Sequence, residues 1–176
     1  MIDGHDVVAV ARFNGDAYKD SQAAELILNA AILRAEIARS YEEFLEIFER
    51  FYSDDVEVSG EDSHELIRGK ERVRGLLFNF LVPLHVMAEI GGILASIRHA
   101  AIPGDVAGET YSAWTLELVD ASGATCTLKW RVFRKWHGSR VVYEHHYDRQ
   151  QIGGPLTFND LNFDSANGAV NAQIPS

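Results

Sequence analysis

Apolar residues recur at helical spacing in the first part of the chain. Over residues 23–51 they fall three or four positions apart, which is typical of helices that bury one face. Ser40, followed three residues later by Glu43, has the pattern of an N-terminal capping box, so the sequence predicts two helices that meet there. The same spacing over residues 70–84 predicts a third helix, in which Pro83 ends or kinks the last turn.

Later in the chain the pattern changes to alternation of apolar and polar residues. Residues 56–58 and 66–68 are each expected to form a short strand. Turn sequences containing Gly interrupt the longer alternating region, so neighbouring strands should pair as antiparallel hairpins. The long strands are expected at 93–102, 106–119, 125–136 and 140–148. Helices followed by a long-stranded meander indicate an α+β fold.

The length and composition fit one domain. The chain has 176 residues, of which 47% are hydrophobic, and a chain of this size can bury a substantial core. We expect the domain to cover residues 23–149, between an N-terminal extension (1–22) and a C-terminal extension (150–176). The C-terminal extension is rich in Gly, Asn, Gln and Ser and offers little to bury.

The charge and cysteine content exclude several classes of partner. A formal net charge of -10 argues against nucleic acid, because binding to a phosphate backbone depends on Lys and Arg. No stretch approaches the roughly 20 apolar residues of a membrane span, so no membrane partner is expected. The single cysteine, Cys126, has no partner for an intramolecular disulfide and is expected to be a packing residue. These features predict a cytoplasmic protein.

Three segments carry a family resemblance. Residues 51–58 (FYSDDVEV), 67–73 (IRGKERV) and 132–148 (VFRKWHGSRVVYEHHYD) are similar in order and spacing to motifs of the NTF2-like, or SnoaL-like, superfamily. That superfamily includes ketosteroid isomerase, SnoaL-type polyketide cyclases, limonene epoxide hydrolase and scytalone dehydratase. The resemblance implies a cone in which N-terminal helices pack on a strongly curved, mixed, mostly antiparallel sheet and leave an apolar pocket at one end.

The candidate chemistry lies in residues 143–148. Alternate residues of a strand share a face, which gives one set of Tyr143, His145 and Tyr147 and an opposite set of Glu144, His146 and Asp148. In the gapless register, the resemblance implies that the first set faces the pocket, with His145 where limonene epoxide hydrolase-like members carry a carboxylate. The second set then lies on the outer face. A one-residue slip in the hairpin would exchange the two sets.

An imidazole in an apolar pocket can take and return a proton near neutral pH. His145 is therefore the candidate general base or acid, and Tyr143 and Tyr147 are candidates to orient a carbonyl or hydroxyl group. The alternative is that His145 is a buried structural histidine and the tyrosines belong to the core. His145 and His146 point apart, so they are not expected to share a metal ion.

Further candidates follow from position. Trp114, Trp130, Val132 and Phe80 are expected to line the pocket, and His64 in an acidic loop is a further candidate acid–base residue beside the alternative of an exposed loop. The resemblance puts Gly60 where ketosteroid isomerase has its general base and Trp130 where it has an acidic residue. Ketosteroid isomerase activity is therefore not expected.

Two classes of function remain open. The first is acid–base catalysis without a cofactor or metal, such as isomerisation, dehydration, cyclisation or hydration of a small hydrophobic carbonyl or hydroxyl compound. The second is a non-catalytic module for binding a small ligand or for dimerisation. In either class a small apolar molecule is the expected ligand. A homodimer is expected to form through the outer face of the sheet.

Overall fold

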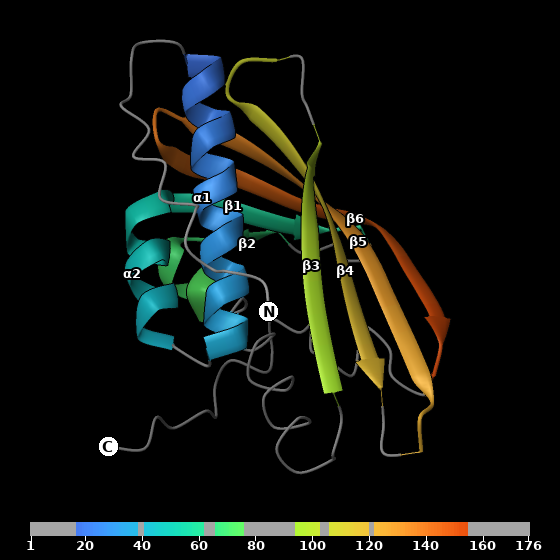
Figure 1. Ribbon diagram of the computed structural model, residues 1–176. Helices are drawn as coiled ribbons and strands as arrows, with labels where there is room; N and C mark the ends of the chain where they lie inside the picture. The colour runs from blue at the N-terminus through green and yellow to red at the C-terminus, as the bar shows by residue number, and fades with distance from the viewer. Residues whose placement is uncertain are drawn as a thin grey trace.

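The computed structural model describes residues 17–38, 41–61, 66–75, 94–102, 106–119 and 122–154. Within these residues the architecture is two helices packed on one face of a curved six-stranded sheet (Figure 1). The elements are α1 (Ala17–Ala38), α2 (Tyr41–Phe51), β1 (Tyr52–Gly60), β2 (Ile67–Arg68), β3 (Leu94–Ile102), β4 (Glu109–Val119), β5 (Thr125–His137) and β6 (Arg140–Gly153). The expected α+β fold is confirmed.

The sheet is mixed and mostly antiparallel, as expected. Its strand order is β2-β1-β6-β5-β4-β3, and β3 to β6 form a meander of antiparallel pairs. The short strand β2 pairs antiparallel with β1, whereas β1 runs parallel to β6. This parallel pairing brings the beginning of the sheet beside its last strand, so residues far apart in sequence meet at β1 and β6.

Several element bounds differ from the prediction. Helix α1 begins at Ala17, inside the expected N-terminal extension, and β6 continues to Gly153. Strand β1 is much longer than residues 56–58, because it finds backbone partners on both sides in β2 and β6. Of the expected third helix, residues 70–75 are helical and the remainder lies outside the described residues.

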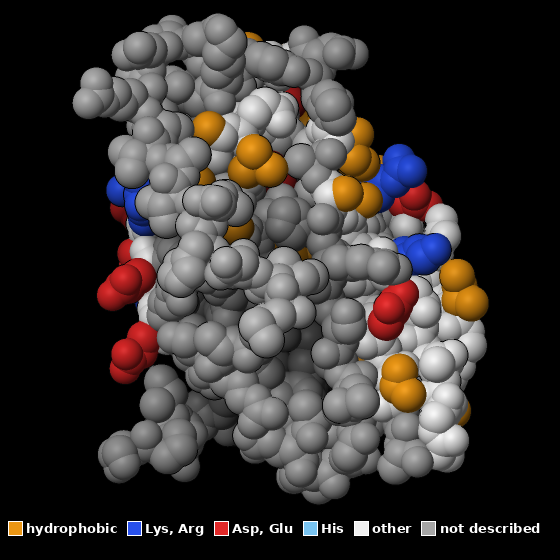
Figure 2. Space-filling model, in the orientation of Figure 1, with side chains coloured by type: hydrophobic (Ala, Val, Ile, Leu, Met, Phe, Trp, Pro, Cys, Tyr) orange, Lys and Arg blue, Asp and Glu red, His pale blue; other side chains and the backbone are white. Residues whose placement is uncertain are grey.

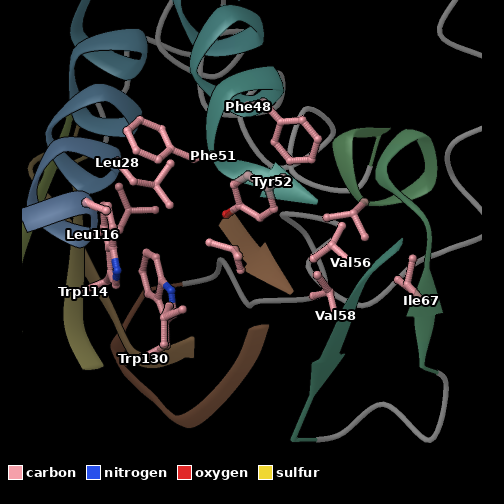
Figure 3. Packing of buried hydrophobic residues seen from close by; sticks show 14 of the residues in the cluster. Leu28, Phe48, Phe51, Tyr52, Val56, Val58, Ile67, Trp114, Leu116 and Trp130 are labelled. Atoms are coloured by element: carbon pink, nitrogen blue, oxygen red, sulfur yellow. The ribbon is translucent and has the colours of Figure 1, made fainter. Parts of the chain in front are cut away.

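The core lies between the helices and the sheet. Along β4 and β5 every second residue is buried, as an alternating strand with one covered face requires. Figure 3 shows Trp114, Leu116 and Trp130 on the sheet, with Leu28 of α1 and Phe51 of α2 packed toward them. Fully burying side chains of this size contributes roughly 1.5–3 kcal/mol each. Cys126 is also buried in this layer, as expected of a packing residue.

Strand β6 contains two irregularities where it pairs with β5. Trp136 lies opposite Val141, but Lys135 lies opposite Tyr143, so Val142 is an extra residue in a β-bulge. A second register shift follows near Asp148, whose backbone is in the left-handed region at φ 53°. Bulges bend a strand and increase its twist, which fits the strong curvature of this sheet. The first bulge also decides which side chains of β6 face the helices.

Candidate active site

The bulge at Val142 reverses the predicted faces of β6. Without an extra residue, Tyr143 would lie opposite Arg134 on the helix side. In the structure Glu144 lies opposite the buried Arg134, and His146 lies opposite the buried Val132. Glu144 and His146 therefore face the helices, and their assignment to the outer face is wrong.

The side chains of Tyr143, His145 and Tyr147 lie on the outer face instead. Their partners on β5 are Lys135, Phe133 and Arg131, which alternate with the buried residues of that strand. The prediction that this set faces the helix-side pocket is wrong for the same reason, the extra residue in β6. Asp148, beyond these residues, forms a 3.0 Å ion pair with the exposed Arg131 and stays on the outer face as expected.

Glu144 is the centre of a buried polar cluster. Its Oε2 atom accepts a hydrogen bond of 2.7 Å from the Tyr52 hydroxyl and one of 2.6 Å from Arg134 Nε. Its Oε1 atom lies 2.6 Å from His146 Nε2. All these groups are nearly or fully buried, and they come from three different strands. The cluster thus joins β1, β5 and β6 on the helix side of the sheet.

Arg134 connects this cluster to helix α1. Its Nη1 atom donates to Glu25 Oε1 at 2.7 Å and to Asn29 Oδ1 at 2.9 Å. Glu25 also accepts from Asn29 Nδ2 and from Thr110 Oγ1, both at 2.9 Å. The hydroxyl of Thr110 in turn accepts a 2.7 Å hydrogen bond from the indole of Trp136. One hydrogen-bonded network therefore reaches from α1 and β4 to His146.

Glu25 and Asn29 were not among the predicted site residues. A signal was available, because Ser21, Glu25 and Asn29 recur every four residues and so share one face of a helix with Ala24 and Leu28. All five residues are buried. Polar residues on a buried helix face indicate that the opposing sheet supplies them with polar partners.

The environment fixes the protonation of Glu144. Burial alone would raise the pKa of this carboxyl, but the charge of Arg134 and the hydrogen bonds from His146 and Tyr52 outweigh it and hold the pKa well below its usual range. Burial and the neighbouring Glu144 charge raise the pKa of Tyr52, which therefore stays a phenol and a donor. An ionised carboxylate only accepts, so Nε2 of His146 must carry the proton of the 2.6 Å contact. In neutral His146 the basic nitrogen is then Nδ1.

The predicted pocket residues of β4 and β5 lie beside this cluster. Trp114, Trp130 and Val132 all face the helices and are almost fully buried. The two indoles are stacked, with ring centroids 6.0 Å apart and 12° between their planes. Figure 3 shows the two side chains next to each other. The indole N–H of Trp114 donates to Ser112 Oγ at 2.9 Å. These side chains form an apolar wall next to His146, which lies opposite Val132.

On the β1 side, the register partner of His146 is Gly60. This glycine contributes no side chain beside the imidazole. His64 and Phe80, the other two predicted site residues, lie outside the described residues.

The outer face carries a row of aromatic rings. The His145 ring stacks on Tyr143 at 6.5 Å and on Tyr147 at 5.7 Å, with interplanar angles of 13° and 3°. Ser59 Oγ lies 2.8 Å from both the Tyr143 hydroxyl and His145 Nδ1. Partial burial, followed by the influence of His146, lowers the pKa of His145. A catalytic role for these three residues would require a second site on this face.

Other features of the described residues are less specific. No group of three or more His, Cys, Asp or Glu side chains among them is arranged to hold a metal ion. None of the described helices is long and apolar enough to cross a membrane. On the face shown in Figure 2, the acidic and basic side chains that are coloured are scattered rather than gathered in one patch.

Comparison with known proteins finds similarity in structure. No family model matches the sequence, and no curated protein matches it. Similar solved structures include an NTF2-like protein of unknown function from Exiguobacterium sp. 255-15, with 10% identity, 70% of this chain and 95% of the other covered, and a TM-score of 0.49. A SnoaL-like protein from Jannaschia sp. CCS1 has 8% identity, 77% and 90% coverage, and a TM-score of 0.49.

A Mycobacterium tuberculosis protein solved in complex with estradiol-17β-hemisuccinate has 17% identity, 70% and 92% coverage, and a TM-score of 0.45. Two of these three structures are thus an NTF2-like and a SnoaL-like protein, and the motifs of the sequence resemble the same superfamily. At these identities and TM-scores, the likeness extends no activity or ligand to this chain.

Proposed function

We propose that the protein catalyses proton transfer without a cofactor, and that His146 is its general base and acid. The observation that carries this proposal is the buried 2.6 Å contact between His146 Nε2 and Glu144 Oε1. A carboxylate that accepts from one ring nitrogen fixes the tautomer and the orientation of the imidazole and leaves the other nitrogen basic. The substrate is a small, mostly apolar carbonyl or hydroxyl compound.

The proton moves between the substrate and His146 Nδ1. In the forward step Nδ1 takes a proton from a C–H or O–H group, and the ring becomes an imidazolium that the Glu144 carboxylate stabilises. The same nitrogen returns the proton at another position, as isomerisation, dehydration, cyclisation or hydration requires. Tyr52 and Arg134 act as positioning residues, because both hold Glu144 Oε2 in place.

The apolar wall supports this chemistry. Val132 lies opposite His146 in the sheet, and Trp130 and Trp114 continue the same face away from it. Electrostatic interactions are stronger where water is excluded, so an ionised carboxylate has a larger effect on the imidazole here than at the surface. A hydrophobic surface with a few polar groups is also the usual composition of a small-molecule site.

Two adjacent histidines provide a matched test. We expect His146→Gln to reduce proton exchange at least about a hundredfold, since general acid–base catalysis contributes on this scale. His145→Gln changes the neighbouring residue on the opposite face and should leave the rate within about twofold. The assay follows deuterium uptake from D2O into small enolisable ketones, and loss of water from β-hydroxyketones, by proton NMR. A rate that depends on His145 and not on His146 would overturn the proposal.

A second function is favoured by one observation. Both carboxylate oxygens of Glu144, as well as Nε and Nη1 of Arg134, already have partners within the protein. A cluster satisfied in this way also suits a structural role in a non-catalytic ligand-binding module. Ligand binding by the wild-type protein without proton exchange on any compound of the panel would establish this alternative.

A further inference from the structure

The buried charges around Arg134 do not add up to a positive charge that would attract an anion. The described cluster contains two carboxylates, Glu25 and Glu144, against one guanidinium. With His146 neutral the cluster carries a net charge of -1, and with His146 protonated it carries zero. In neither state does it present a net positive charge to a ligand.

Among the described residues, Arg134 is the cation in direct contact with the cluster, and it already binds two carboxylates. Its Nε atom contacts Glu144 at 2.6 Å and its Nη1 atom contacts Glu25 at 2.7 Å. Its side chain is only 2% exposed. An incoming carboxylate would share this guanidinium with two buried carboxylates, and displacing either of them would leave an uncompensated buried charge.

Four other described cations are paired with acidic side chains or exposed. Lys70 binds Glu49 at 3.0 Å and Asp54 at 2.9 Å near the start of β1. The cationic side chains of Lys129, Arg131 and Lys135 are exposed and alternate with the helix-facing residues of β5. These three side chains of β5 lie on the opposite surface of the sheet from His146, whereas Lys70 is paired with Glu49 of α2.

The sequence limits what the remaining segments can add. Residues 62–65, 76–93 and 155–176 contain no Lys or Arg. Among the other segments outside the described residues, Arg12 and Arg39 are the only residues of these two types. The segments outside the described residues therefore add two such cations at most, in a chain that has 16 Lys and Arg against 26 Asp and Glu.

We infer that the helix-side site accepts neutral or cationic ligands and discriminates against carboxylates and phosphates. This inference rests on the proposed function, because it places the ligand beside His146. A like charge at close range in a poorly solvated site weakens binding by about tenfold or more, even at an effective dielectric constant near 20.

The test uses three probes that share one naphthalene ring system. Isothermal titration calorimetry at pH 7 would measure the binding of 2-naphthalenemethanol, 2-naphthylmethylammonium and 2-naphthoate to the wild-type protein. We expect the alcohol and the ammonium to bind, and the carboxylate to bind at least about tenfold more weakly than the alcohol. Equal or tighter binding of 2-naphthoate would overturn the inference alone. Failure of all three to bind would overturn both the inference and the proposed small-molecule site.

A charge-matched pair of variants assigns the effect to the cluster. Glu25→Gln removes one buried negative charge, whereas Glu46→Gln removes one from an exposed position of α2. We expect Glu25→Gln to improve 2-naphthoate binding about tenfold relative to the alcohol, and Glu46→Gln to change this ratio less than twofold. An unchanged ratio in a folded Glu25→Gln protein, checked by circular dichroism, would overturn the assignment. If Glu25→Gln does not fold, the wild-type probe series decides the inference.

Discussion

At the scale of single residues, Glu144 shows what a buried carboxylate requires to stay ionised. It is fully buried, yet Arg134, Tyr52 and His146 all bind it. Removing one member of such a buried pair typically costs about 3–5 kcal/mol, because the remaining charge is uncompensated. Each of these residues is therefore needed to keep the others stable in the buried cluster.

The depressed pKa of Glu144 predicts a pH dependence of stability. In the unfolded chain the pKa of a Glu side chain is about 4.3. The native carboxyl titrates well below this, so its stabilising contribution is complete above about pH 4.3 and is lost as the pH falls toward the native pKa. Over that window the free energy of unfolding should fall by about 1.4 kcal/mol per pH unit because of this group alone.

Urea unfolding between pH 7 and pH 3 measures this contribution. The wild-type protein should lose more stability below pH 4.3 than Glu144→Gln, which lacks the titrating group. Glu46→Gln, at an exposed site, should keep the wild-type slope. Parallel curves of stability against pH for wild type and Glu144→Gln would contradict the prediction, because Glu144 would then titrate alike in the folded and the unfolded chain.

At the scale of elements, one extra residue decides which side chains of β6 face the helices and which face outward. The alternation of β4 and β5 and the turns between them predicted those strands to within a few residues, since a half-buried strand has a period of two. The faces of β6 could not be predicted in this way. Val141 and Val142 are identical in type, and nothing in the sequence marks Val142 as the residue that leaves the ladder.

The local sequence pattern could not predict the buried cluster either. Arg134 and Glu25 are separated by 109 positions and meet only when α1 packs on the sheet. Periodicity predicts which residues share a face within one element, but it does not predict which elements oppose each other. The sequence therefore predicted that the candidate site includes the last strand. It could not predict which side chains form the site in the structure, because this depends on the bulge and on how α1 packs on the sheet.

Deletion of Val142 tests the role of the bulge. Removing the extra residue closes the bulge and still leaves Tyr143 opposite Lys135 and Glu144 opposite Arg134, so both faces of β6 keep their side chains. We expect the deletion to keep the buried ion pair and to cost less than the roughly 3–5 kcal/mol of breaking it. Insertion of an alanine after Val142 adds one more residue before Glu144, and a strand that keeps a single bulge then turns Glu144 away from Arg134, so this variant should lose about 3 kcal/mol or more in the free energy of unfolding. Equal stability of the deletion and insertion variants in urea unfolding would show that the number of residues before Glu144 does not hold the register.

At the scale of the whole molecule, the two surfaces of the sheet have different roles. The helix side holds the apolar core and the network from α1 to His146, and the outer side holds the row of rings on β6. In that row the ring faces are stacked against one another, so a partner would meet ring edges and polar groups. Such a surface suits a second protein surface better than a flat ligand that needs an open ring face.

We therefore expect a homodimer through the outer face. Light scattering should give twice the 19.6 kDa mass of one chain. Phe133→Glu, which places a charge beside Tyr143 in the row of rings, should shift the mass to that of the monomer. Glu46→Gln on α2 is the control and should remain dimeric. A wild-type mass of one chain would contradict the expectation.

The neighbouring residues His145 and His146 lie on opposite surfaces of one strand, and this gives the molecule a built-in pair of spectroscopic labels. Their ring protons resonate in the same uncrowded region of an NMR spectrum but experience different surroundings. A small molecule that enters between helices and sheet perturbs the inner ring, whereas association of two chains perturbs the outer one. A single titration can therefore separate ligand entry from self-association without any added probe.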